Sequence, residues 1–257
     1  MNPLIPQDFA EAGFAANRRA PTPLARYQVL GERSSGTNFV SRLLGRNSSM
    51  RPATDLGWKH GFPREAPVPA DLGVICMTRR ADDWALSMHR KPWHAPPELQ
   101  ALEFGDFIRA PWETVVDRPR YFTAAMQAGA LGGPLLLDRD PDTGAAFADL
   151  FALRTAKMRA MLGYMARDCT CVLLSVETAQ AEPEATLDAL LYVMGHPPRS
   201  TPYRQVVKRL GSRFKPAIPE RPKTPARMGK AGRRFMRARL DEELERQLGY
   251  SYDSPAD

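Results

Sequence analysis

The sequence predicts an α/β fold, a three-layer sandwich with a mostly parallel central sheet. Short apolar runs typical of buried strands alternate with longer segments in which apolar residues recur at helical spacing. Strands that alternate with helices favour a parallel sheet covered on both faces. With 257 residues, 43% of them hydrophobic and 25% charged, the chain has the composition of a globular protein with a sizeable core.

The strands expected in chain order are short apolar segments that end near glycine or polar residues: 27–30, about 57–60, 73–78 and 170–175. The helices expected between and after them have apolar residues three or four positions apart: 39–44, 82–89, 97–109, 144–166, 183–194 and 234–248. We see no internal repeat and no second domain. The chain is therefore expected to be one domain, 1–257, with an N-terminal extension over 1–24.

Several classes of protein are disfavoured. No apolar run approaches the roughly 20 residues that span a bilayer, and Asp8 and Glu11 interrupt the stretch where a signal peptide would be apolar. A cytoplasmic location without a transmembrane segment is therefore expected. Three cysteines and four scattered histidines form neither a disulfide framework nor a zinc motif, so no metal is expected.

Positive charge is concentrated near the C-terminus. The segment 199–239 holds 14 basic residues and one acid, Glu220, which leaves the other residues at 22 − 28 = −6 of the total of +7. Such a segment could bind nucleic acid, an anionic membrane or the phosphates of a small ligand, or could be a solvated, proline-rich loop. It contains few aromatic residues for base stacking, so specific nucleic-acid binding is not expected.

The segment from Gly31 to Phe39, GERSSGTNF, lies where the first strand ends and a helix begins. Backbone N–H groups and the helix dipole converge there on an anion. Gly31 and Gly36 have the spacing of a Walker A loop, but Thr37 and Asn38 follow where that motif has Lys and Ser or Thr. The missing lysine disfavours a magnesium-dependent nucleotide triphosphatase.

These letters resemble the GERxSGTNY loop of bacterial sulfotransferases that use 3′-phosphoadenylyl sulfate (PAPS). The resemblance implies a P-loop NTPase-like sulfotransferase fold. It implies that Ser35, Gly36 and Thr37, with Asn38 beside them, bind the 5′-phosphosulfate of PAPS and that Phe39 stacks on its adenine. Ser34 stands where related loops have lysine, so Arg33 is our candidate for the missing cation and Ser34 for a neutral donor.

A second match, WKHGFP from Trp58 to Pro63, is similar to the segment that carries the family's catalytic histidine. The resemblance makes His60 the general base, and an imidazole with a pKa near 6.5 suits proton removal from an acceptor hydroxyl. Lys59 would add positive charge near the leaving phosphate. Neighbours on a strand alternate in direction, so one of these two side chains is expected to point elsewhere.

Two further matches concern the 3′-phosphate of PAPS. Arg79 and Ser87, eight residues apart, resemble the family's RNPxDxxxS element, whose Arg and Ser grip that phosphate. Arg227, Gly229 and Lys230 resemble a late RKGxxG loop that binds the same group, which implies that the basic segment 199–233 closes over the nucleotide.

The function implied by the resemblance is transfer of a sulfuryl group from PAPS to a hydroxyl or amine by in-line displacement. The acceptor would be a carbohydrate or another small hydroxylated compound, and 93–144 would shape its pocket. Two alternatives stay open: a P-loop kinase-like phosphotransferase, and a non-catalytic polyanion or nucleic-acid binder that uses 199–239. The acceptor and the oligomeric state are not set by the sequence.

Overall fold

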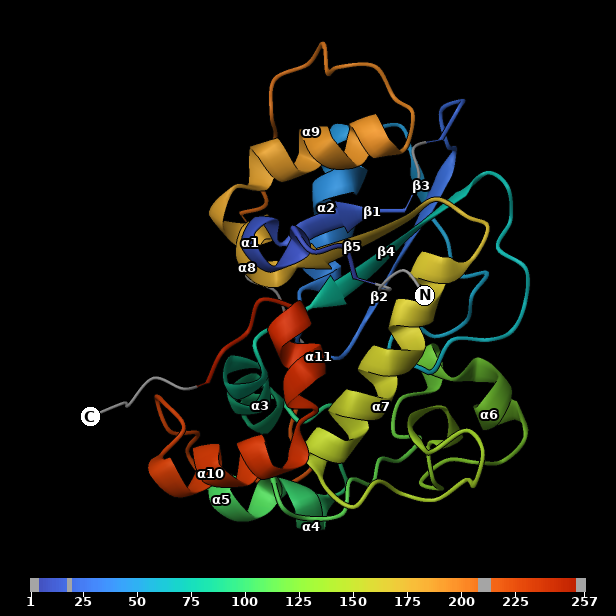
Figure 1. Ribbon diagram of the computed structural model, residues 1–257. Helices are drawn as coiled ribbons and strands as arrows, with labels where there is room; N and C mark the ends of the chain where they lie inside the picture. Colours follow the sequence, from blue (N-terminus) through green and yellow to red (C-terminus); the bar gives the residue numbers. More distant parts are fainter. Residues whose placement is uncertain (1–4, 18–19, 208–213, 253–257) are drawn as a thin grey trace. The chain divides into compact units, whose positions relative to one another are not determined.

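The protein has a mixed sheet of five strands in the computed structural model, which describes residues 5–17, 20–207 and 214–252. The strands are β1 (Phe14–Ala16), β2 (Arg26–Gly31), β3 (Arg51–Pro52), β4 (Leu72–Thr78) and β5 (Cys171–Ser175), in the order β1-β5-β4-β2-β3 (Figure 1). β2, β3, β4 and β5 are mutually parallel, and β1 pairs with β5 antiparallel. The predicted α/β class with a mostly parallel sheet is confirmed.

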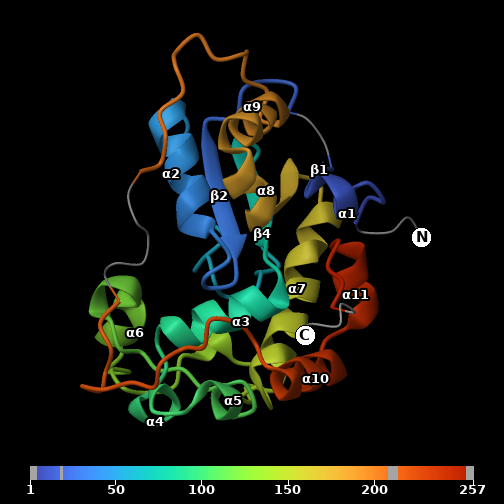
Figure 2. The same cartoon turned by 90° about the vertical axis from the view of Figure 1, so that its left-hand side faces the viewer.

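The sheet residues alternate between two apolar clusters. Val29, Ile75 and Leu174 belong to one cluster, whereas their neighbours Leu30, Cys76 and Leu173 belong to the other. The first cluster includes residues of α2 (Thr37–Asn47), α8 (Val176–Ala181) and α9 (Pro183–Val193), which lie on one face of the sheet (Figure 2). The second includes residues of α1 (Phe9–Ala12), α11 (Glu242–Gln247) and the C-terminal part of α7 (Leu150–Leu162).

The described residues group into two compact units. The first unit lies within Met1–Arg80, Lys157–Leu210 and Asp241–Ser254 and contains the whole sheet. The second lies within Ala81–Ala156 and Gly211–Leu240 and contains α3 (Ala81–Arg90), α4 (Pro97–Gln100), α5 (Phe104–Phe107), α6 (Thr123–Gln127) and α10 (Lys230–Arg239). Three short 3₁₀ helices complete the list: η1 (Pro119–Tyr121), η2 (Leu136–Asp138) and η3 (Gly163–Ala166). The expectation of a single domain stays a prediction.

The expected strand at 57–60 is wrong. The chain turns at Gly57, whose φ of 86° lies in the left-handed region and whose N–H donates to the carbonyl of Thr54. A second turn follows, in which the N–H of Gly61 donates to the carbonyl of Trp58. The parallel strand that pairs with β2 on this side is the shorter β3.

Three helix predictions have the wrong bounds. The expected helix over 97–109 is two helices, α4 and α5, and the one over 234–248 is α10 and α11, separated because Asp241 caps α11 by accepting from the N–H of Leu244. The helix expected from residue 144 begins at Leu150, where the carboxylate of Asp149 accepts from the N–H groups of Phe151 and Ala152. The short elements α1, β1 and α8 were not predicted.

Candidate functional site

The order of the parallel strands places a topological switch point between β2 and β4. The chain runs from β2 to β3 on one side and then crosses to β4 on the other. In open α/β sheets, ligands bind outside the carboxyl ends of the strands at such a point. Here Gly31 and Thr78 end these two strands, so the loop from Glu32 to Gly36 and the side chain of Arg79 lie where a ligand is expected.

The loop has a tight backbone that depends on its small residues. Ser34 and Gly36 have φ values of 65° and 87°, and the Ser35 hydroxyl donates to the carbonyl oxygen of Glu32 at 2.7 Å. A Cβ atom on Gly36 would lie 2.4 Å from Cγ2 of Val176. The second glycine of the motif is therefore required both by its φ and by its close approach to α8.

The turn leaves backbone donors at the N-terminus of α2. The amides of Phe39 and Val40 donate to the carbonyl of Gly36. Within the described part of the chain, the amides of Gly36, Thr37 and Asn38 have no protein acceptor. Successive N–H groups at the positive end of an 11-residue helix form a site for an anionic group.

Two cationic side chains flank this loop. Nη1 of Arg79 donates to the carbonyl oxygen of Ser34 at 2.7 Å, and Nζ of Lys59 donates to Oδ1 of Asn38 at 2.6 Å. Burial lowers the pKa of Lys59 to about 8, so the ammonium is the major form at pH 7. The structure therefore brings Arg79 and Lys59 to the loop, and the roles that the sequence assigns to them stay predictions.

His60 lies beside the end of β2 with a defined tautomer. Its Nδ1 lies 2.6 Å from the carbonyl oxygen of Gly31, and because a carbonyl only accepts, Nδ1 carries the proton. Nε2 then has the free lone pair of a base. The pKa of His60 is well below 6.5, chiefly because of burial and then because of the positive charge of Lys59, so the ring is neutral at pH 7.

The turn at 58–61 changes the expected relation between Lys59 and His60. Strand alternation would direct one of the two side chains away, but the segment is not a strand. Lys59 reaches Asn38 while His60 reaches Gly31, so both side chains contact the segment 31–38. A main-chain hydrogen bond also links the turn to the end of β2, because the N–H of Gly31 donates to the carbonyl of Lys59 at 3.0 Å.

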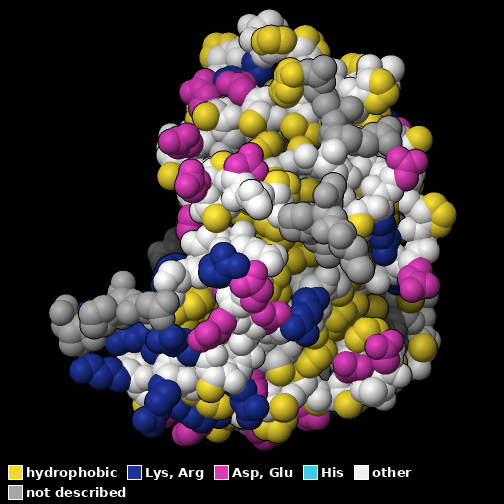
Figure 3. Space-filling view, in the orientation of Figure 1, with side chains coloured by type: hydrophobic (Ala, Val, Ile, Leu, Met, Phe, Trp, Pro, Cys, Tyr) yellow, Lys and Arg dark blue, Asp and Glu magenta, His cyan; other side chains and the backbone are white. Residues whose placement is uncertain are grey.

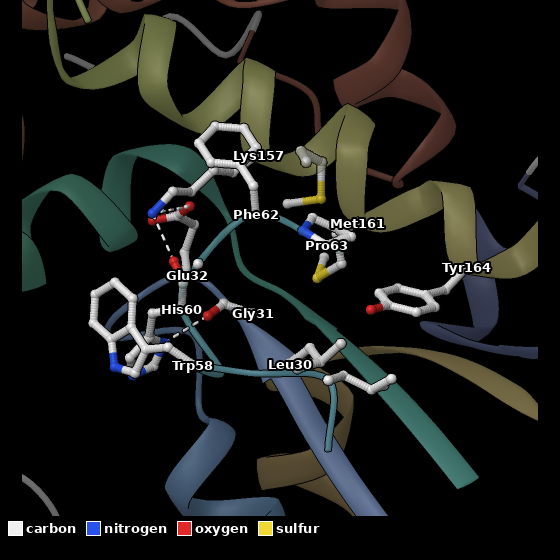
Figure 4. Close-up of a pocket in the computed structure, with 13 residues that line it drawn as sticks. Leu30, Gly31, Glu32, Trp58, His60, Phe62, Pro63, Lys157, Met161 and Tyr164 are labelled. Carbon is white, nitrogen blue, oxygen red and sulfur yellow. Dashed lines mark hydrogen bonds and ion pairs between the residues drawn. The ribbon is translucent and has the colours of Figure 1, made fainter. Parts of the chain in front are cut away.

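Arg33 lies in the interior, at 2% exposure. Its guanidinium carbon is 5.6 Å from the centroid of the Trp58 ring. Its neighbour Glu32 is also buried and forms an ion pair with Lys157, whose Nζ lies 3.8 Å from Oε1 of Glu32. Lys157 also donates to the carbonyl oxygen of His60 at 2.6 Å (Figure 4).

Sequence reasoning missed Glu32, Trp58 and Lys157 as members of this cluster. Glu32 lies in the motif GERSSGTNF and Trp58 in WKHGFP, so their positions in these motifs could have indicated that they lie near the site. Lys157 lies in α7 among residues that the helical pattern assigns to the core, and no local pattern distinguishes it.

A hollow of about 390 Å³, open solvent included, lies beside the loop. Figure 4 shows the side chains around it, with Trp58 and His60 at one end and Tyr164 at the other. Its lining is mainly apolar and consists of Leu30, Gly31, Glu32, Leu56, Trp58, His60, Gly61, Phe62, Pro63, Lys157, Met158, Met161 and Tyr164. All of these residues belong to the first unit, and the role of 93–144 stays a prediction.

The remaining predicted residues have other surroundings. Phe39 is half-buried and packs against the apolar cluster that includes α2. Ser87 is half-buried in α3, and Arg227, Gly229 and Lys230 are exposed at the start of α10; all four belong to the second unit. The structure does not bring them together with the loop in one compact unit, so their part in the site stays a prediction.

Positive charge gathers over α10 in the space-filling view (Figure 3). The exposed basic residues of this helix are Lys230, Arg234, Arg237 and Arg239. Among the described residues, no helix is both long and apolar enough to cross a bilayer. Over the same ranges, no group of three His, Cys, Asp or Glu side chains is placed to hold a metal ion.

Comparisons of the chain with known proteins do not identify a family for it. The chain matches no model of a protein family, no curated protein and no solved structure.

Proposed function

We propose that this chain is a sulfotransferase with a P-loop NTPase-like fold that moves the sulfuryl group of PAPS to a hydroxyl or amine. The observation that carries the proposal is the loop at the switch point, where the amides of Gly36, Thr37 and Asn38 are available to an anion and Arg79 lies alongside. The resemblance of this loop to GERxSGTNY supports the choice of PAPS among phosphorylated ligands.

The donor would be held at two places. The 5′-phosphosulfate would accept hydrogen bonds from the loop amides and from the Thr37 hydroxyl, with Lys59 as the nearby cation. Between the two candidates for the missing loop lysine, the structure favours Lys59, because Arg33 is buried against Trp58. Arg79 would pair with the 3′-phosphate, and the expected parts of Ser87 and of 227–230 in binding that phosphate stay predictions.

The chemical step would be an in-line displacement at sulfur. The acceptor oxygen forms a bond to sulfur as the bond from sulfur to the phosphate oxygen breaks, and adenosine 3′,5′-bisphosphate leaves. Nε2 of His60 receives the acceptor's proton, since Nδ1 is committed to Gly31. Lys59 and the helix dipole stabilise the negative charge that grows on the leaving phosphate.

Two rivals share part of this geometry. A kinase-like phosphotransferase would use the same loop, but Thr37 and Asn38 follow Gly36 where a Walker motif has its lysine. A non-catalytic polyanion binder would use the exposed basic side chains of α10 instead.

Thermal unfolding with three ligands separates these functions. A ligand that binds only the folded state raises Tm, so adenosine 3′,5′-bisphosphate should raise Tm more than ATP with magnesium does. A rise with ATP and magnesium alone would identify the kinase-like function. Salt-sensitive binding to duplex DNA, together with no response to the bisphosphate, would identify the polyanion binder.

A further inference from the structure

The residues on either side of Arg79 are each held by a hydrogen bond to a distant part of the chain. Before it, the hydroxyl of Thr78 lies 3.1 Å from the hydroxyl of Tyr250, 172 positions away. After it, the main-chain N–H of Arg80 donates at 2.9 Å to Oε1 of Glu177, 97 positions away. All of these residues belong to the first unit.

Tyr250 and Glu177 are also joined to each other. The Tyr250 hydroxyl lies 3.1 Å from Oε2 of Glu177, and because a carboxylate only accepts, the phenol donates its single proton there. The Tyr250 oxygen then accepts from the hydroxyl of Thr78. Glu177 thus receives a hydrogen bond on each carboxylate oxygen, and the contacts run without a gap from the residue before Arg79 to the residue after it.

The sequence places Glu177 in the first turn of α8, directly after β5. The strand ends at Ser175, whose hydroxyl accepts from the N–H of Thr178 and so caps the helix. Val176, between the cap and Glu177, is the residue that a Cβ atom on Gly36 would meet at 2.4 Å. The first turn of α8 therefore contacts the loop after β2 through Val176 and the chain after β4 through Glu177.

Tyr250 comes from the C-terminal segment, which passes the carboxyl end of β4 after the chain leaves α11 (Figure 1). Its side chain is 8% exposed and belongs to the apolar cluster that includes α1 and α11, so packing fixes the ring. Two further contacts hold the segment there. The Arg80 guanidinium donates to the carbonyl oxygen of Ser251 at 3.0 Å and lies 4.8 Å from the centre of the Tyr252 ring.

These contacts bear on the direction of the Arg79 side chain. Its Nη1 donates to the carbonyl oxygen of Ser34, so the guanidinium lies against the loop. The main chain at Cα sets the direction of a side chain, and here the residues one before and one after are both held. A binding side chain acts at full strength only when its neighbours keep it within about 0.5 Å of the productive geometry.

We propose that Glu177 and Tyr250 are positioning residues, which hold Arg79 so that its guanidinium pairs with the 3′-phosphate of the donor nucleotide. This role rests on the proposed sulfotransferase function, since it needs a ligand with a phosphate at that place. The two residues act through Arg79 and not on the ligand. Affinity for a nucleotide without a 3′-phosphate is therefore independent of them.

Calorimetry with adenosine 3′,5′-bisphosphate and adenosine 5′-phosphate tests this role. Wild type should prefer the bisphosphate by roughly tenfold or more, the effect of one charge-assisted pair. Glu177→Leu should lose about tenfold of this preference, because a guanidinium that is no longer held forms a weaker pair, and its affinity for the 5′-phosphate should stay nearly unchanged. Glu177→Gln should restore the preference, since the amide oxygen still accepts from the N–H of Arg80.

Tyr250→Phe is a second variant, which keeps the packed ring and removes the phenol that donates to Glu177. It should lower the preference about threefold, the effect of one neutral hydrogen bond. Tyr252→Phe is the matched control, because the Tyr252 hydroxyl donates at 2.7 Å to Glu245, a carboxylate of α11. This variant should keep the wild-type preference. If Glu177→Leu does not fold, the comparison of these two variants gives the answer.

The results separate the positioning role from the proposed function. The positioning role is wrong if Glu177→Leu keeps the preference or weakens both nucleotides equally, if Glu177→Gln does not restore it, or if the two Phe variants behave alike. In each of these cases the function stands when wild type shows a preference that Arg79→Ala removes. If wild type binds both nucleotides equally or binds neither, the 3′-phosphate contact does not exist, and the proposed donor fails together with the positioning role.

Discussion

Lys157 donates a hydrogen bond of 2.6 Å to the main-chain carbonyl of His60. The same ammonium lies 3.8 Å from the carboxylate of Glu32, and both side chains are about 5% exposed or less. A residue of α7 thus joins the loop after β2 to the turn that carries the proposed general base. The Nζ atom is also within 6 Å of the Trp58 and Phe62 ring centres, at 5.7 and 5.6 Å.

Lys157→Met should destabilise the protein, because it removes the ammonium that lies 3.8 Å from the buried Glu32 carboxylate. Breaking a buried ion pair typically costs about 3–5 kcal/mol. Urea unfolding would report this loss as a lower free energy of unfolding. The double variant Glu32→Gln with Lys157→Met should recover much of that loss. Arg159→Met, on an exposed position of the same helix, is the control and should change stability by about 1 kcal/mol or less.

Equal unfolding free energies for Lys157→Met and Arg159→Met would contradict this account. So would a double variant that is less stable than Lys157→Met alone, since removal of the Glu32 charge must help if the loss of its attraction to Lys157 is the cause.

His60 should lose its function as a base only in acid. The pKa of its ring lies well below 6.5, so the neutral form persists at pH 7 and is lost as pH falls through that lower value. The acid limb of the profile of kcat/KM for sulfuryl transfer is therefore expected below pH 6.5. His60→Ala should lower kcat by about 10²-fold or more while it leaves bisphosphate affinity nearly unchanged.

A variant of Lys59 tests whether His60 is the group that sets the pH of this acid limb. The charge of Lys59 is the second cause of the low pKa of His60, so Lys59→Gln should move the limb upward. A limb above pH 6.5 in the wild-type enzyme, or one that does not respond to Lys59→Gln, would show that another group is the base.

The sequence predicts the centre of this fold better than its edges. β4 and β5 are continuous apolar runs that are buried on both faces, and α2 follows the first strand with a clear apolar stripe. The strand β1 has three residues and pairs through its main chain, so side-chain periodicity does not predict it. The sequence predicts a strand where the chain turns at Gly57, because the residue types do not reveal a φ of 86°.

The sequence likewise predicts only part of the candidate site. The loop and the histidine are contiguous motifs, and the sequence identifies both. The Glu32–Lys157 pair joins residues 125 positions apart in the chain, and only the packing of α7 against β2 brings them together. The full burial of Tyr164, which lines the hollow, is known only from the structure, because burial depends on residues that are far apart in the chain.

Arg79→Ala should weaken adenosine 3′,5′-bisphosphate far more than adenosine 5′-phosphate, because a guanidinium pairs with the additional phosphate in the first ligand only. A charge-assisted pair of this kind is worth about 1.5–3 kcal/mol, which corresponds to roughly 10- to 150-fold in Kd. Arg80→Ala is the neighbouring control, since the Arg80 guanidinium donates to Ser251 and lies over the Tyr252 ring. Equal losses for both nucleotides would place Arg79 against some other part of the ligand.

Gly36→Ala should destabilise the loop and reduce affinity for the bisphosphate together. The new methyl group would lie 2.4 Å from Val176, and alanine at a φ of 87° is strained by about 1–3 kcal/mol. Gly163→Ala is the matched control, because no atom lies within 4 Å of its would-be Cβ and its φ is not in the left-handed region. Similar unfolding free energies for the two variants would show that the loop does not need its glycine.

Lys59 gives the donor site a dependence on alkaline pH. Its pKa is about 8, so the ammonium that would face the 5′-phosphate is present below that pH and is lost as pH rises through it. The charge of a phosphate monoester is constant above pH 7, because its second pKa is near 6. Affinity for the bisphosphate should therefore fall by about tenfold between pH 7 and pH 9.5, as one charge-assisted contact disappears. Lys59→Arg keeps its charge throughout this range and should bind with nearly constant affinity, as titration calorimetry can measure. A wild-type affinity that stays flat to pH 9.5 would place Lys59 away from the phosphate.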